Sequence, residues 1–147
     1  MDRPYIAEND SERARLEDLL ARLTDEDFAR PMGEHWTVGV GLIHLAFWDR
    51  MWLSKLEEWE RIGFVDLPAL SIVRDVNDAM LGWWRSIAPA QIRHEVLAAI
   101  RAFDEKSAAL PDRIVEPILA DRPRTLTRAL HRRQHLDEIE TALSSRG

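Results

Sequence analysis

Two histidines stand four residues apart in the stretch "TRALHRRQHLDEI", residues 125–137. On an α-helix, His131 and His135 would point the same way, with about 6 Å between their β-carbons. Two imidazoles in this arrangement can bind a divalent metal ion, but a pair alone does not close a metal site. The same pair can instead pack in a protein core, with each ring hydrogen-bonded to a neighbour. The choice between these alternatives depends on a third ligand elsewhere in the chain.

The third ligand that the sequence favours is His44. Residues 37–61 have the periodicity of a long amphipathic helix, and His44 lies in the middle of its wide apolar face. His131 and His135 also lie on the face of their helix that should turn inward. Burying an imidazole without a partner costs about 1–3 kcal/mol, and a metal ion removes that cost by binding the ring nitrogen. Three histidine ligands leave one coordination position open, as in catalytic metal sites.

The other two histidines are expected outside this site. His35 precedes its helix in a connection, and His94 stands between Arg93 and Glu95 in "QIRHEVLAAI". Charged neighbours on both sides are typical of a position at the boundary of a helix face rather than of a ligand position in the core.

The elements that must position these histidines are four helical blocks separated by Gly, Pro and polar residues. No strand pattern persists, so we expect an all-α fold, a four-helix bundle formed by one domain spanning 1–147. The connection 62–74 is long enough to cross the bundle, which allows the second and third helices to run parallel. Pro89, inside the third block, marks either a break or the first turn of a new helix. The blocks cover about 11–23, 37–61, 75–110 and 125–144.

Composition excludes several classes of protein and site. The net charge of −6 and the absence of any basic block make nucleic acid an unexpected partner. No cysteine is present, which excludes disulfides and thiolate ligands. The longest apolar stretch, 38–48, is shorter than the about 20 residues of a membrane span, so no membrane partner is expected. The first residues lack the apolar segment of a secretory signal, and we expect a cytoplasmic protein.

Three motifs resemble those of one known superfamily. "GEHWTVGVGLIHLAFWDRMW" (33–52) resembles the second-helix signature of the DinB/YfiT-like superfamily, in which a Trp precedes a ligand His by eight residues. "RALHRRQHLDEIETAL" (128–143) resembles its fourth-helix signature. Residues 75–119 are similar to the branch that includes the N-terminal domain of mycothiol-dependent maleylpyruvate isomerases. The resemblance covers nearly the whole chain.

The resemblance implies a fold and a metal site. The fold is a four-helix bundle of up-down-down-up topology, with a long crossover between the second and third helices. The site holds a divalent metal ion, often zinc or nickel, on His44, His131 and His135. Homodimers are common in the superfamily, and its characterised members include transferases that use low-molecular-weight thiols.

The chemistry of such a site leaves two functional classes open. A divalent ion on three neutral imidazoles can lower the pKa of a bound water toward about 7, or bind a thiol as thiolate. The chain has no thiol of its own, so the second route needs a small thiol such as mycothiol or bacillithiol. The first class is therefore a metal-dependent thiol transferase or hydrolase that acts on a small molecule. The second is a non-catalytic small-molecule-binding or dimeric interaction protein with a vestigial metal site.

Further site candidates lie near the histidines in the sequence. Glu138, three residues after His135, either orients a ligand imidazole, acts as a catalytic base or is a solvated residue near the helix end. Trp48 and Lys55 lie near the His44 face and are candidates for substrate binding, although Lys55 also fits a side chain that extends toward the bundle end.

The sequence also predicts whether two further pairs of residues lie in the core or at the surface. Asp49 and Asp137 lie off the ligand faces of their helices and are expected to be surface charges. Trp83 and Trp84 are adjacent and cannot both face the core, so one is expected at a pocket mouth or a dimer interface.

Overall fold

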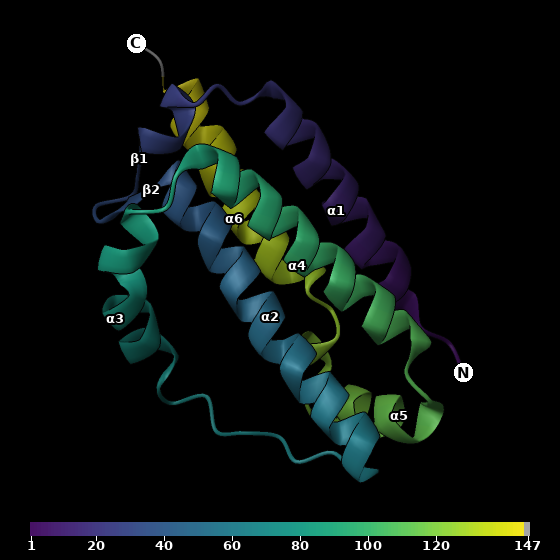
Figure 1. The fold of residues 1–147 in the computed structure, drawn as a ribbon. Helices are drawn as coiled ribbons and strands as arrows, with labels where there is room; N and C mark the ends of the chain where they lie inside the picture. Colours follow the sequence, from purple (N-terminus) through teal and green to yellow (C-terminus); the bar gives the residue numbers. More distant parts are fainter. Residues whose placement is uncertain (146–147) are drawn as a thin grey trace.

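The computed structural model describes residues 1–145 of the chain. Its secondary structure is helical apart from one antiparallel pairing of two two-residue strands, so the predicted all-α class is confirmed. Figure 1 shows the elements in order. They are α1 (Pro4–Arg22), η1 (Glu26–Ala29), β1 (Pro31–Met32), β2 (Trp36–Thr37), α2 (Val38–Ile62), α3 (Val73–Arg85), α4 (Pro89–Ala109), α5 (Asp112–Asp121), η2 (Pro123–Thr125) and α6 (Ala129–Ser144).

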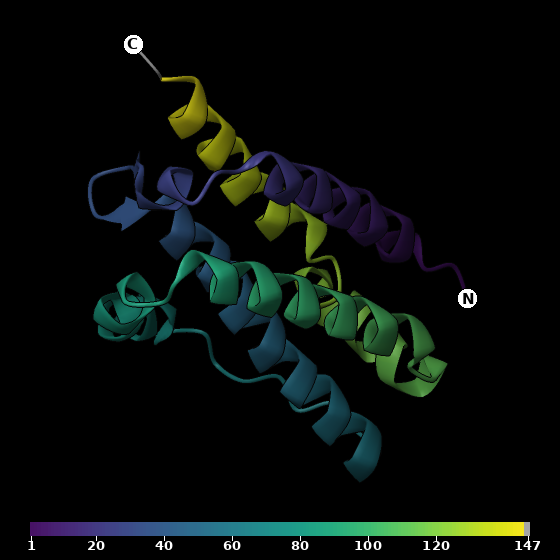
Figure 2. The same cartoon turned by 45° about the horizontal axis from the view of Figure 1, so that its top comes forward.

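The four longest helices, α1, α2, α4 and α6, pack side by side (Figures 1 and 2). Helix α2 packs against α4 and α6, and α1 packs against the same two helices from the other side. In Figure 1, α2 and α4 both run away from the end that carries β1 and β2, whereas α1 and α6 run toward it. The connection after α2 returns along the outside of these helices to α3, which packs beside α2.

Local signals in the sequence account for the ends of α2. The Thr37 hydroxyl accepts a hydrogen bond from the Val40 N–H at 3.2 Å, which caps the helix. At the other end, Gly63 takes the left-handed conformation with φ 88°, where a side chain would be strained. Helix α2 therefore keeps His44 in a fixed register over its 25 residues.

The third predicted block is two helices rather than one. Pro89 occupies the first turn of α4, where its missing N–H costs nothing, and the chain changes direction between α3 and α4. Residues 111–124 lie between the third and fourth predicted blocks and contain three prolines, yet they include α5. Pro117 lies inside that helix. Burial of Ile114, Val115 and Ile118 offsets the backbone hydrogen bond that the proline removes.

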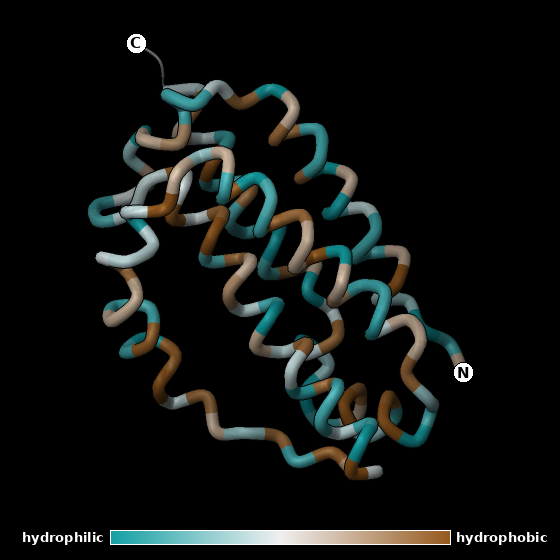
Figure 3. Tube along the Cα trace, viewed as in Figure 1, coloured by the Kyte–Doolittle hydropathy of each residue, from teal (hydrophilic) through white to brown (hydrophobic). Residues whose placement is uncertain are grey.

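The apolar core has two parts. The larger lies toward the β1–β2 end and includes Leu16, Leu42 and Ile100. The smaller lies toward α5 and includes Trp59 and Phe103. Figure 3 shows apolar and hydrophilic positions alternating along the long helices, as burial of one face requires. No helix within residues 1–145 is long and apolar enough to cross a bilayer.

Candidate metal centre

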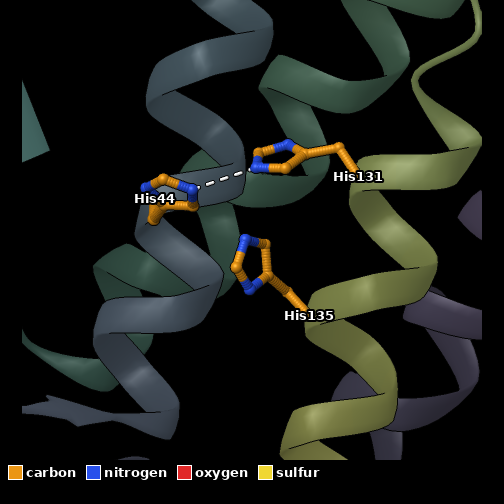
Figure 4. A group of neighbouring side chains, drawn as sticks. All are labelled: His44, His131 and His135. Carbon is orange, nitrogen blue, oxygen red and sulfur yellow. Dashed lines mark hydrogen bonds between the residues drawn. The ribbon is translucent and has the colours of Figure 1, made fainter. Parts of the chain in front are cut away.

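Three histidines from two helices converge beside the larger part of the core (Figure 4). His44 comes from α2, and His131 and His135 come from successive turns of α6. One nitrogen of each ring lies within 4.8 Å of the other two, and the Nε2 atoms of His44 and His131 are 3.0 Å apart. A tetrahedral ion with bonds of about 2.1 Å holds its ligand nitrogens about 3.4 Å apart. The three rings therefore fit one ion after small side-chain adjustments.

All three imidazoles are held in the neutral form that a metal ligand requires. Burial, together with the neighbouring His135 and Arg128, lowers the pKa of His44 to about 3. Burial is also the largest cause that lowers the pKa of His131, with Arg128 next, and burial lowers the pKa of His135 despite the opposing Glu138 carboxylate. Near neutral pH each ring therefore carries one unprotonated nitrogen.

Glu138 contacts one of the three histidines. Its Oε2 lies 3.1 Å from Nδ1 of His135, one turn back along α6. A carboxylate accepts hydrogen bonds, so it favours the tautomer with the proton on Nδ1 and the lone pair of Nε2 directed to the other rings. Glu138 is absent from the residues that line a pocket of about 700 Å³ beside the three histidines. Of the three roles that the sequence left open, the geometry favours orientation of His135.

His131 has the opposite arrangement on its outer nitrogen. Arg128 Nη2 lies 2.9 Å from His131 Nδ1, and a guanidinium can only donate, so Nδ1 is the acceptor. The proton of neutral His131 is then on Nε2, directed toward Nε2 of His44. A metal ion on Nε2 requires the proton on Nδ1 instead, and Arg128 must then give up this hydrogen bond.

A buried carboxylate anchors Arg128. Asp49 accepts from Arg128 Nε at 2.8 Å and from Arg132 at 2.9 Å, and Arg132 also donates to Asp104 at 2.7 Å. Asp49 is 0% exposed, so the prediction that it is a surface charge was wrong. Helix α2 is covered by neighbours on several sides, and a position well off the His44 face still lies inside the protein. Asp137, by contrast, is exposed and pairs with Arg15, as expected.

A pocket of about 700 Å³ adjoins the three histidines. Its wall contains both aromatic rings and three arginines. Trp36 stacks obliquely on His44 with 4.7 Å between ring centroids. The indole N–H of Trp48 donates to Asn77 of α3 at 2.8 Å, which holds that ring in place. The aromatic residues are Trp36, Trp48 and Trp52, and the arginines are Arg122, Arg124 and Arg128.

The structure brings together some of the candidate residues and not others. Trp48 lines the pocket with the three histidines. Lys55 does not line it and pairs with Glu58 at 2.7 Å. His35 and His94 are exposed, outside the cluster.

The adjacent tryptophans on α3 lie in different environments, as their adjacency in the sequence predicted. Trp84 is buried, with its ring centroid 5.6 Å from that of His44, whereas Trp83 is 64% exposed and lies outside the pocket wall.

Sequence reasoning missed the arginines of the pocket. They stand in "DRPRTLTR" (121–128), immediately before the histidine pair. Three arginines in seven residues, spaced beside a candidate metal site, were the available signal. They share the pocket wall with His44 and Trp48 because segments distant in the sequence pack together, which cannot be derived from spacing along one segment.

Comparison with known proteins settles the family. The model of the mycothiol maleylpyruvate isomerase N-terminal domain matches residues 10–140. The chain belongs to that family. The match spans all three histidines of the cluster and every residue that lines the pocket, and the family is DinB/YfiT-like, which confirms the resemblance. No curated protein and no solved structure matches the chain.

Proposed function

We propose that this member of the mycothiol maleylpyruvate isomerase N-terminal domain family is a metal-dependent enzyme that acts on a small molecule. His44, His131 and His135 hold the ion, with zinc and nickel the expected metals. The observation that carries the proposal is the convergence of three neutral imidazoles within 4.8 Å of one another beside a pocket of about 700 Å³. Pockets of about 300–1,000 Å³ are typical of small-molecule sites.

The reaction we favour is transfer of a low-molecular-weight thiol, with hydrolysis as the second class. An ion with an open coordination position supplies Lewis acidity and lowers the pKa of a bound thiol or water. The thiol must come from outside because the chain has no cysteine, and the family takes its name from a mycothiol-dependent enzyme. The pocket has room for a thiol and an acceptor beside the histidines.

The chain's own residues have separate tasks in this proposal. The three imidazoles bind the ion, and Glu138 fixes the orientation of His135. Trp36 and Trp48 line the pocket with apolar surface beside the histidines. A bound substrate that displaces water from this surface would interact more strongly with the charges of the site.

A non-catalytic binding protein is the alternative, and one observation favours it. Each ring has a polar partner without any metal: His44 and His131 contact each other, His131 contacts Arg128, and His135 contacts Glu138. Such a cluster satisfies most of its hydrogen-bonding groups in the metal-free protein. In this case the pocket would bind a small molecule without turnover.

A screen for reaction separates these functions. Tag-free protein loaded with zinc or nickel is incubated with small electrophiles, with and without mycothiol or bacillithiol, and with ester and amide substrates. The proposal expects turnover that is lost in His131→Ala and retained in His94→Ala, since His94 lies on the exposed side of α4. Absence of turnover in a metal-loaded protein that still binds small molecules would favour the binding-protein alternative.

We also propose an up-down-down-up four-helix bundle and a homodimer. The directions of α1, α2, α4 and α6 in Figure 1 support the topology. The dimer is supported by Trp83, which is 64% exposed on α3, and by the exposed Ile72 at the start of that helix. Analytical ultracentrifugation tests the dimer, and a sedimentation mass near 17.0 kDa at micromolar concentration would contradict it.

A further inference from the structure

The wall of the pocket carries positive charge in a protein that is negative overall. Arg122, Arg124 and Arg128 line it, and within the described chain no Asp or Glu does. The whole chain has 26 acidic and 20 basic side chains, so a wall with only basic charges is opposite in sign to the average surface. A concave site that combines arginines with apolar rings concentrates small anions.

The three arginines differ in how far their donors are already used. Arg128 is anchored by Asp49, which offsets its charge. Arg122 donates one nitrogen to the Pro68 carbonyl at 2.7 Å, which fixes the side chain and leaves its other donors for a ligand. Arg124 is exposed, and no hydrogen bond or ion pair joins its side chain to the rest of residues 1–145. Two guanidinium groups therefore have donors available at the pocket.

A second, independent feature lies next to them in the chain, at Thr125. Thr125 lines the pocket and is 2% exposed, yet its hydroxyl has no hydrogen-bond partner in the described part of the chain. A buried hydroxyl without a partner costs about 1–3 kcal/mol, so such groups are normally satisfied by a ligand or water. Helix α6 also begins here, at Ala129, and the N-terminus of a helix favours negative charge.

We propose that this pocket binds small molecules through an oxyanion, a carboxylate or a phosphate, held by Arg122 and Arg124 with Thr125 beside them. The apolar part of the ligand contacts Trp48 and Trp52, and its other end reaches the histidine cluster. The inference names the substrate class of the proposed function and rests on it for the reaction. Binding of the anion itself does not require the metal.

Arg128 couples the anion site to the metal site. If His131 bound a metal ion through Nε2, Arg128 would lose its acceptor on Nδ1, while Asp49 would still hold its Nε. The freed end of the guanidinium is then available to the anion in the pocket. A substrate anion and the metal ion are therefore expected to bind together more favourably than separately.

The test uses three aromatic probes of similar shape: benzoate, phenyl phosphate and the neutral benzamide. Each is titrated into chelator-treated, tag-free protein and followed by isothermal titration calorimetry and by quenching of tryptophan fluorescence, since Trp48 and Trp52 line the site. We expect one or both anions to bind and benzamide not to bind over the same millimolar range. The anion that binds more tightly distinguishes a carboxylate ligand from a phosphate ligand.

Variants assign the binding to the arginines. Arg122→Gln combined with Arg124→Gln is expected to weaken the binding of the anion at least tenfold. Arg101→Gln is the matched control, because Arg101 is an exposed arginine that pairs with Glu17 away from the pocket. Circular dichroism verifies that each variant is folded.

Three results would overturn the inference: benzamide binding as tightly as the anions, the double variant binding like wild type, or no anion binding at all. The metal assignment fails separately. If the protein takes up no zinc but binds benzoate through Arg122 and Arg124, the result contradicts the metal site and still supports the anion site. His94→Ala without metal is expected to bind the anion as wild type does, because His94 is exposed and lies outside the pocket wall.

Discussion

Replacing Asp49 by Asn is expected to destabilise the protein strongly while changing its volume very little. The carboxylate is fully buried and accepts charged hydrogen bonds from Arg128 and Arg132 at 2.8 and 2.9 Å. Each such bond is worth about 1.5–3 kcal/mol, and breaking a buried ion pair typically costs about 3–5 kcal/mol because the remaining charge has no partner. Arg132 keeps Asp104, so we expect a loss of about 3–4 kcal/mol rather than more.

The measurement is urea unfolding of chelator-treated protein, followed by circular dichroism, with the free energy of unfolding taken from the midpoint and slope. Asp137→Asn is the matched control. Asp137 is also an aspartate outside the ligand face of its helix, but it is exposed and pairs with Arg15, so its replacement should change stability by less than about 1 kcal/mol. The reasoning is refuted if Asp49→Asn and Asp137→Asn have the same stability within error.

The histidine cluster gives three further predictions. Below the unfolded-state pKa of about 6.5, the unfolded chain binds a proton that buried, neutral His44 does not. The free energy of unfolding of the metal-free protein should therefore fall by up to about 1.4 kcal/mol per pH unit for each such ring, as pH falls toward the folded-state pKa of about 3. Urea unfolding from pH 7 to pH 5 measures this, and a free energy that does not change with pH contradicts it. Long-range proton–nitrogen NMR should show His131 protonated on Nε2 in the metal-free protein, because Arg128 can only donate to Nδ1. With zinc on Nε2, the proton should instead be on Nδ1. An unchanged tautomer would show that the Arg128 contact does not oppose metal binding. Glu138→Ala should weaken zinc binding about tenfold, measured by competition with a chelating dye, whereas an unaltered affinity would mean that Glu138 does not orient His135.

The features that the sequence predicted are those set by local signals. Thr37 caps α2 and Gly63 ends it, and both act on their own neighbours in the chain. The spacing of His131 and His135 places them on one face of α6, and the apolar surroundings of His44 place it inward. These inferences need only helix geometry, and they are sufficient to identify the three residues of the cluster.

The features that the sequence missed depend on contacts between distant segments. Helix α5 forms despite Pro117 because its apolar face is buried against the smaller part of the core. Asp49 is buried because Arg128, just before α6, and Arg132, within it, reach it across 79 and 83 positions of the chain. A helical wheel treats one helix at a time and assigns the face opposite the core to solvent. In a packed bundle, a charge on that side can be buried when partners from another helix neutralise it.

The most direct test of the metal site compares thermal unfolding with and without metal. Protein purified without an affinity tag is measured as isolated, after chelation and after addition of zinc or nickel, with elemental analysis of each sample. If His44, His131 and His135 bind the ion, a thousandfold excess over Kd adds about 4 kcal/mol to the free energy of unfolding. The melting temperature should then fall on chelation and recover on reloading in wild type and in His94→Ala, but should not respond to metal in His131→Ala. A wild-type melting temperature that changes with neither chelator nor added metal, with no stoichiometric metal in the isolated protein, would contradict the metal site.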